Sequence, residues 1–96
     1  MTAYWMTIYK EISDGAKVAA YAELAGAALR GAGGTYLVRG LPEHIFESGE
    51  TTRTVLIAFD SVEAALAAHD SPAYQEALAA LDGGAVLDMR IVPGVD

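Results

Sequence analysis

The sequence contains no cysteine among its 96 residues. Disulfide bonds, zinc–thiolate centres and thiol nucleophiles are therefore excluded. Basic residues are also scarce, because six lysines and arginines stand against thirteen acidic residues, and the formal net charge is −7. The basic residues are scattered singly and form no stripe. The charge pattern therefore argues against nucleic acid and anionic membrane surfaces as partners.

Long hydrophobic runs and recognisable catalytic motifs are missing as well. No segment reaches the roughly 18 uninterrupted apolar residues of a membrane-spanning helix. The N-terminus, MTAYWMTIYK, lacks the charged start and long apolar centre of a secretory signal. Phosphate-binding loops and serine-nucleophile motifs are absent, and His44 and His69 form no recognisable metal set. We therefore expect a cytoplasmic protein with no cofactor and no metal.

Apolar residues, in contrast, are abundant for so short a chain. The length suits a single domain over residues 1–96, and 53% of the residues are hydrophobic whereas 20% are charged. A chain of this size buries a modest fraction of its surface. The excess of apolar residues therefore predicts a buried subunit interface. The alternative is a composition rich in alanine, which contributes little burial per residue.

Runs of β-branched and aromatic residues predict the strands, which fall at residues 3–9, at 35–39 with a continuation at 43–47, at 51–59 and at 85–92. We expect 43–47 and 51–59 to pair as an antiparallel hairpin. The runs 3–9 and 51–59 are apolar at almost every position. That pattern is typical of strands in the middle of a sheet.

Two helical regions separate these strands. The first spans about 16 residues, from a cap at Ser13 or Asp14 to a glycine-rich stop. The second is capped by Asp60 or Ser61 and is broken at Ser71-Pro72. A serine cap followed by proline at the first helical position is a favourable helix start. The sequence therefore predicts that a new helix begins there.

The resulting order, β-α-β-β-α-β with a broken second helix, is that of a ferredoxin-like α+β fold. Its two helical regions cover only one face of the sheet. The central strands are apolar on both faces, so the second face needs cover too. A second copy of the chain, packed sheet against sheet, is the simplest partner, and we expect a homodimer.

Several short motifs resemble one known family. They are AYW in the first strand, YLVRG, RTVLIAFDS, DSPAYQ and the terminal RIVPGV. In this order they resemble the family called domain of unknown function 1330, over about residues 3–95. The resemblance implies a dimeric α+β barrel, a superfamily that includes cofactor-independent monooxygenases, isomerases, haem-degrading enzymes and ligand-binding modules. Fold does not decide among these activities.

Arginines near strand ends are the first candidate binding residues. Arg39 and Arg53 can clamp a carboxylate or phenolate through two hydrogen bonds. The alternative is a solvated strand end or a salt bridge to Glu47 or Asp60. Trp5 and Tyr9 share one face of the first strand and can shape an aromatic pocket. The alternative for these two is ordinary core packing.

His69 is the candidate catalytic residue. It ends the apolar stripe of the second helical region, where it can act as a general base near neutral pH or interact with the helix dipole. Asp70 follows directly, and on a helix the two side chains point about 100° apart. We therefore expect no bond between them and expect Asp70 to cap the next helix. Tyr74 either offers its hydroxyl to a ligand or packs in the core.

Three hypotheses for function remain open from the sequence. The first is a cofactor-independent enzyme, or the relic of one, that acts on a small polar aromatic or carboxylate compound. The second is a small-molecule-binding module without catalysis. The third is a purely structural dimer.

Overall fold

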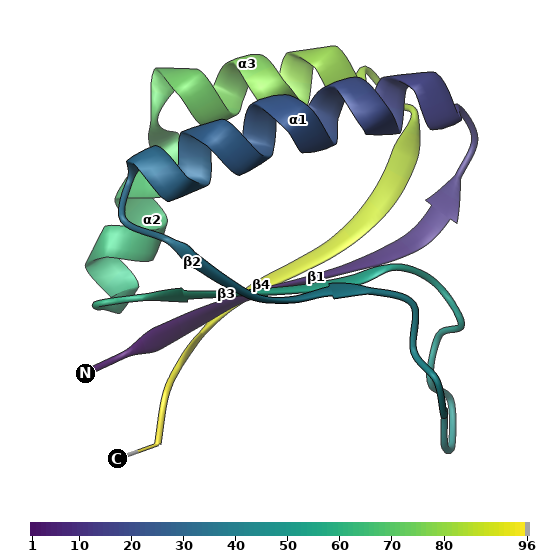
Figure 1. Ribbon diagram of the computed structural model, residues 1–96, viewed down its shortest axis with the longest axis horizontal. Helices are drawn as coiled ribbons and strands as arrows, with labels where there is room; N and C mark the ends of the chain where they lie inside the picture. The colour runs from purple at the N-terminus through teal and green to yellow at the C-terminus, as the bar shows by residue number, and fades with distance from the viewer. Residues whose placement is uncertain (96) are drawn as a thin grey trace.

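Four antiparallel strands form one sheet in the computed structural model, which describes residues 1–95 (Figure 1). The spatial order is β2-β3-β1-β4. The strands are β1 (Ala3–Ile12), β2 (Thr35–Gly40), β3 (Thr54–Phe59) and β4 (Ala85–Pro93). The two most apolar strands, β1 and β3, lie in the middle, as their sequence pattern predicts.

Three helices cover one face of this sheet (Figure 1). They are α1 (Gly15–Gly31), α2 (Val62–Asp70) and α3 (Pro72–Leu81), and α1 packs beside α3. The order of elements confirms the predicted ferredoxin-like α+β fold with its second helical region broken. None of the helices in residues 1–95 combines the length and the hydropathy that crossing a bilayer requires.

Side-chain caps fix where the helices begin. Asp14 caps α1, because its Oδ1 accepts hydrogen bonds from the backbone N–H groups of Ala16 and Lys17 at 3.0 and 3.2 Å. Ser61, and not Asp60, caps α2 by accepting from the N–H of Ala64 at 3.0 Å. These bonds satisfy backbone donors that the first turn of a helix leaves free.

The break between α2 and α3 depends on Ser71. Its hydroxyl donates to the carbonyl of Ala68, at 2.7 Å, and accepts from the N–H of Tyr74, at 3.3 Å. One side chain thus closes α2 and opens α3, with Pro72 at the first helical position. The predicted restart is confirmed. The prediction that Asp70 caps α3 is wrong, since Asp70 is the last residue of α2.

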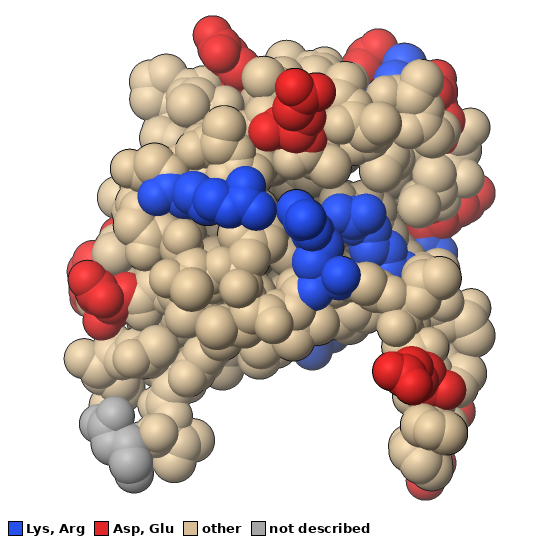
Figure 2. All heavy atoms as spheres, in the orientation of Figure 1, with Lys and Arg blue, Asp and Glu red and all other residues tan. Residues whose placement is uncertain are grey.

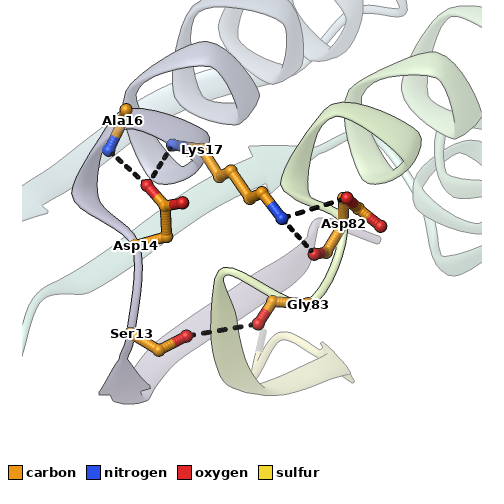
Figure 3. A network of polar contacts seen from close by, with 6 residues as sticks. All are labelled: Ser13, Asp14, Ala16, Lys17, Asp82 and Gly83. Atoms are coloured by element: carbon orange, nitrogen blue, oxygen red, sulfur yellow. Dashed lines mark hydrogen bonds and ion pairs between the residues drawn. The ribbon is translucent and has the colours of Figure 1, made fainter.

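A second set of polar contacts joins the start of α1 to the end of α3 (Figure 3). The Nζ of Lys17 donates to the carboxylate and the carbonyl of Asp82, at 3.0 and 3.1 Å. The Ser13 hydroxyl donates to the carbonyl of Gly83 at 3.3 Å. These contacts hold the two helices in register at one end of the layer.

The predicted hairpin of 43–47 with 51–59 is wrong. Residues 43–47 are not a strand, and β2 itself pairs with β3. Pro42 has no N–H to donate to a ladder, and residues 43–50 are all exposed. The segment 41–53 instead forms an arm whose middle projects from the side of the sheet opposite the helices (Figure 1), whereas Arg53 at its base pairs with Tyr9 of β1.

Alternation along β1 separates a buried face from an open one. Trp5, Thr7 and Tyr9 are buried beneath the helices, whereas Met6 on the other face is 36% exposed. Trp5 is among the largest fully buried side chains of the core. The helix-covered face is therefore the place where a site can be built from β1.

Replacing Ser71 with alanine tests the joint between α2 and α3. Ser71→Ala removes both hydrogen bonds of the hydroxyl, and we expect the free energy of unfolding to fall by about 1 kcal/mol. Chemical denaturation followed by circular dichroism measures this change. Ser48→Ala, in the exposed arm, is the matched control and should shift stability by less than about 0.5 kcal/mol. Equal stability of the two variants would refute the role of Ser71.

Candidate functional site

A cavity of about 20 Å³ lies between the helix-covered face of the sheet and α1. Four of the predicted site residues line this cavity together, and we call it the arginine cleft: Trp5, Tyr9, Arg39 and Arg53. The other lining residues are Thr7, Tyr21, Ala22, Ala25, Leu29, Tyr36, Val55 and Ile57. Four of these twelve residues are aromatic, and the volume suits about one water-sized group.

Three guanidinium groups surround the tyrosines of this cleft. The Cζ of Arg30 lies 4.6 Å from the ring centre of Tyr36, and the Cζ of Arg39 lies 5.7 Å from the same centre. The Cζ of Arg53 lies 5.6 Å from the ring centre of Tyr9. Figure 2 shows basic side chains gathered in a row between the helix layer and the sheet. Cation–π attraction holds such groups against aromatic rings.

These arginines have no carboxylate partner in the part of the chain that the structure describes. Within residues 1–95, the ion pairs are formed by Lys17, His69 and Arg90, and by none of the three cleft arginines. The predicted alternative, a salt bridge from Arg39 or Arg53 to Glu47 or Asp60, is therefore not formed in this part of the chain. Positive charge is concentrated here although the whole chain is acidic.

Arg53 also carries a buried donor without an acceptor. Its Nε has no hydrogen-bond partner within residues 1–95, and neither does the buried hydroxyl of the preceding Thr52. An unsatisfied buried donor is costly, more so when it is charged. Because the Nε itself is closed to solvent, an anion in the cavity would meet another part of the Arg53 guanidinium.

The tyrosines beside these arginines remain protonated hydroxyl donors. Burial raises the pKa of Tyr9, and the nearby Arg53 only partly opposes this. Burial likewise raises the pKa of Tyr36, against the opposing charges of Arg30, Arg39 and Arg53. Neutral phenols next to guanidinium groups make a lining of hydrogen-bond donors, which suits an anionic ligand.

His69 lies in a different cleft. This second cleft, of about 310 Å³, is lined by Trp5, Leu66, His69, Met89, Arg90 and Ile91. Trp5 is the only one of these that also lines the arginine cleft. The structure therefore does not bring His69 together with Arg39 and Arg53.

The expectation that His69 and Asp70 do not bond is wrong. The Nδ1 of His69 lies 3.0 Å from the Oδ1 of Asp70. Asp70 is the last residue of α2, so the regular helical spacing no longer fixes the direction of its side chain. The ring itself packs against Trp5 and Tyr74, with centroid distances of 5.8 and 5.3 Å. His69 therefore both faces a cleft and contacts the core.

Tyr74 lies in the core and lines neither cleft. It is fully buried, and its hydroxyl lies 2.8 Å from that of Tyr21 and donates to the Sδ of Met89 at 3.3 Å. Burial raises the pKa of Tyr74 to about 12. Its ring also meets Trp5 edge to face, at a centroid distance of 5.0 Å. Tyr74 therefore supports the wall between the two clefts.

The sequence predictions missed Tyr36, which lines the arginine cleft, and Arg30, which lies outside the lining and contacts the ring of Tyr36. Tyr36 and Arg39 stand three residues apart in the motif YLVRG, a spacing that simple alternation would place on opposite faces. A register shift between Tyr36 and Val38 lets both line the same cleft. Arg30 lies in the last turn of α1, where a basic side chain is expected to interact with the helix dipole. Only the fold shows that this turn ends above β2.

Comparison with known proteins places the chain in a family without an assigned reaction. The profile of the family described as "Domain of unknown function (DUF1330)" matches residues 2–95. No curated protein matches the sequence.

Solved structures share the fold at low sequence identity. A protein of unknown function from Rhodopseudomonas palustris has a TM-score of 0.78 and 16% identity, over 99% of this chain and 83% of that one. A dimeric ferredoxin-like protein of unknown function from Jannaschia sp. CCS1 has a TM-score of 0.71 and 18% identity, over 98% of this chain and 100% of that one. SnoaB, a cofactor-independent oxygenase from Streptomyces nogalater, has a TM-score of 0.67 and 12% identity, over 99% of this chain and 94% of that one.

Proposed function

We propose, from the premise that this chain belongs to the DUF1330 family, that it binds a small aromatic carboxylate in the arginine cleft without a cofactor. The observation that carries this proposal is the guanidinium of Arg53, which lines the cavity and forms no ion pair within residues 1–95. A carboxylate supplies the acceptor and the opposite charge together.

The size of the cavity decides how such a ligand lies. A volume of about 20 Å³ has room for about one water-sized group, so one oxygen of the carboxylate fits it and an aromatic ring does not. The carboxylate therefore enters between Arg53 and Arg39, and the aromatic body stays at the mouth. There it stacks on the exposed guanidinium of Arg39, which itself lies over the ring of the half-buried Tyr36. Trp5 and Thr7, joined by a hydrogen bond of 2.9 Å, form part of the wall behind the carboxylate.

Binding without turnover is enough for this proposal. The cofactor-independent oxygenase of the same fold shows that such a scaffold can carry chemistry in another protein. At 12% identity, the reaction of that oxygenase cannot be transferred to this chain. The charge and burial of the arginine cleft support a binding site in either case.

Titration calorimetry with benzoate tests the cleft. We expect saturable binding of one benzoate per chain by the wild-type protein. Arg53→Gln should weaken it at least tenfold, since a charge-assisted hydrogen bond contributes about 1.5–3 kcal/mol. Lys17→Gln removes the same charge from the ion pair at the other end of α1 and should leave affinity within twofold. Equal loss in both variants, or no binding at all, would contradict the proposal.

A second candidate function uses the other cleft for proton transfer. In the pair of His69 and Asp70, the carboxylate can hold the Nδ1 proton, which leaves Nε2 free to accept a proton from a carbon or oxygen acid. Asp70 would then stabilise the imidazolium ion. The observation that favours this function is the 3.0 Å contact beside a cleft of about 310 Å³.

Hydrogen–deuterium exchange at an acidic carbon measures this activity directly. With phenylpyruvate as the probe in deuterated buffer, NMR should show exchange of its methylene protons faster than in buffer alone. We expect His69→Gln to lower the excess rate at least tenfold and Asp70→Asn to lower it by less. His44→Gln, in the exposed arm, is the matched control. An excess rate that survives in His69→Gln would exclude His69 as the base.

We also propose that the protein acts as a cytoplasmic homodimer, with the open faces of two sheets packed together. Met6 and Val92 on that face are 36% and 38% exposed. Leu56 of β3 lies directly opposite Met6 of β1 on the same face. The arm of residues 41–53 and the end of β4 project from this side and flank it (Figure 1). Figure 2 shows the molecule hollowed between these two projections.

The apolar arm supports a second copy as the occupant of this hollow. Leu41 and Phe46 are 73% and 81% exposed in the single chain. Exposed apolar side chains of this size are typical of interaction surfaces. A twofold dimer uses the same surface of both subunits, so the arm of each subunit would lie against its partner.

Light scattering tests the dimer. The wild type should have a mass of about 20 kDa, twice the 10.0 kDa of one chain. Met6→Glu places a charge in the proposed interface and should give a monomer at micromolar concentration. Leu24→Glu, at a similarly exposed apolar side chain on α1, should remain a dimer. A monomeric wild type would refute the proposal.

A further inference from the structure

We infer that the arginine cleft selects an aromatic dicarboxylate over a monocarboxylate, and that Arg30 is the residue that sets this preference. The inference rests on the proposed binding function and names its ligand class. It follows from three observations: the path of the Arg30 side chain, the lack of ion pairs to Arg30, Arg39 and Arg53 within residues 1–95, and the arrangement of charge about Tyr36.

The Arg30 side chain is held against the cleft by the shape of α1. A Cβ atom at Gly26 would lie 3.0 Å from the Nη1 of Arg30, so the guanidinium folds back over this glycine. Gly26 is one helical turn before Arg30 and is buried. Residues four apart are neighbours on a helix surface. The missing side chain at position 26 therefore leaves room for the guanidinium to lie over Tyr36.

The resulting charge exceeds what a monocarboxylate can balance. Arg30, Arg39 and Arg53 are half of the six basic residues of the chain, and none forms an ion pair within residues 1–95. A single carboxylate on Arg53 leaves two guanidinium groups without a counter-charge. A second carboxylate on the same ligand compensates these as well.

Tyr36 sets the geometry of the second carboxylate. Arg30 and Arg39 both lie against its ring, at 4.6 and 5.7 Å from the centre. A benzene ring stacked at the cleft mouth therefore holds one carboxylate toward Arg53 and the other toward Arg30 and Arg39. The two carboxylates must point in different directions, as they do in isophthalate.

Calorimetric titration with benzoate and isophthalate tests this inference. The wild-type protein should bind isophthalate at least tenfold more tightly than benzoate, and the ratio should fall as salt is added. Arg30→Gln should bring isophthalate close to the benzoate affinity and leave benzoate within twofold. Gly26→Ala should act in the same direction, because its methyl group displaces the guanidinium while alanine favours the helix.

Gly31→Ala is the matched control, since a Cβ there meets nothing within 4 Å and α1 is otherwise unchanged. Gly31→Ala should keep the wild-type ratio of isophthalate affinity to benzoate affinity. If benzoate and isophthalate bind equally well to the wild type, or if Arg30→Gln keeps the ratio, the inference is wrong while the proposed function stands. If neither ligand binds, the proposed function itself fails and the inference fails with it.

Discussion

Packing around Trp5 is the interaction on which the rest of the helix-covered face depends. Trp5 lies on the central strand β1, is 2% exposed, and meets Tyr74 edge to face at 5.0 Å. Phe59 and His69 lie at centroid distances of 6.3 and 5.8 Å. Aromatic contacts of this kind add to the stabilisation that burial alone provides. The indole N–H donates to Thr7, so the ring is fixed in its plane as well as packed.

This one side chain also explains why the structure has two clefts and not one. Trp5 lines both the arginine cleft and the second cleft, so it is the wall between them. Tyr74 supports that wall from the helix layer through its contacts with Tyr21 and Met89. A large aromatic group in the middle of a small sheet thus divides the space beneath the helices.

Local chemistry made much of the fold predictable from the sequence. Alternation along β1, the Asp14 cap and the Ser71-Pro72 restart each follow from interactions within a few residues. The arm of residues 41–53 was not predictable in the same way. Residues 43–47 have a strand-like composition, but β2 already occupies the free edge of β3. Competition between segments for one edge depends on the whole sheet and not on local propensity.

The candidate site shows the same limit. Arg39, Arg53, Trp5 and Tyr9 could be chosen because each lies on or beside an apolar strand. Arg30 could not, since its role depends on α1 ending above Tyr36 and on the glycine one turn earlier. Helical spacing does not predict the contact of His69 with Asp70, because Asp70 is the last residue of α2 and the helix no longer fixes the direction of its side chain.

The division of the site limits the chemistry that one chain can perform. An anion clamp and a base on the same small molecule need their groups within reach of one ligand, at hydrogen-bond distance from each. Here Trp5 stands between Arg53 and His69, and its burial and its bond to Thr7 keep it there. A ligand held by Arg53 is therefore not the molecule whose proton His69 takes within one chain. Binding and proton transfer are separate properties of this fold, and either can exist without the other.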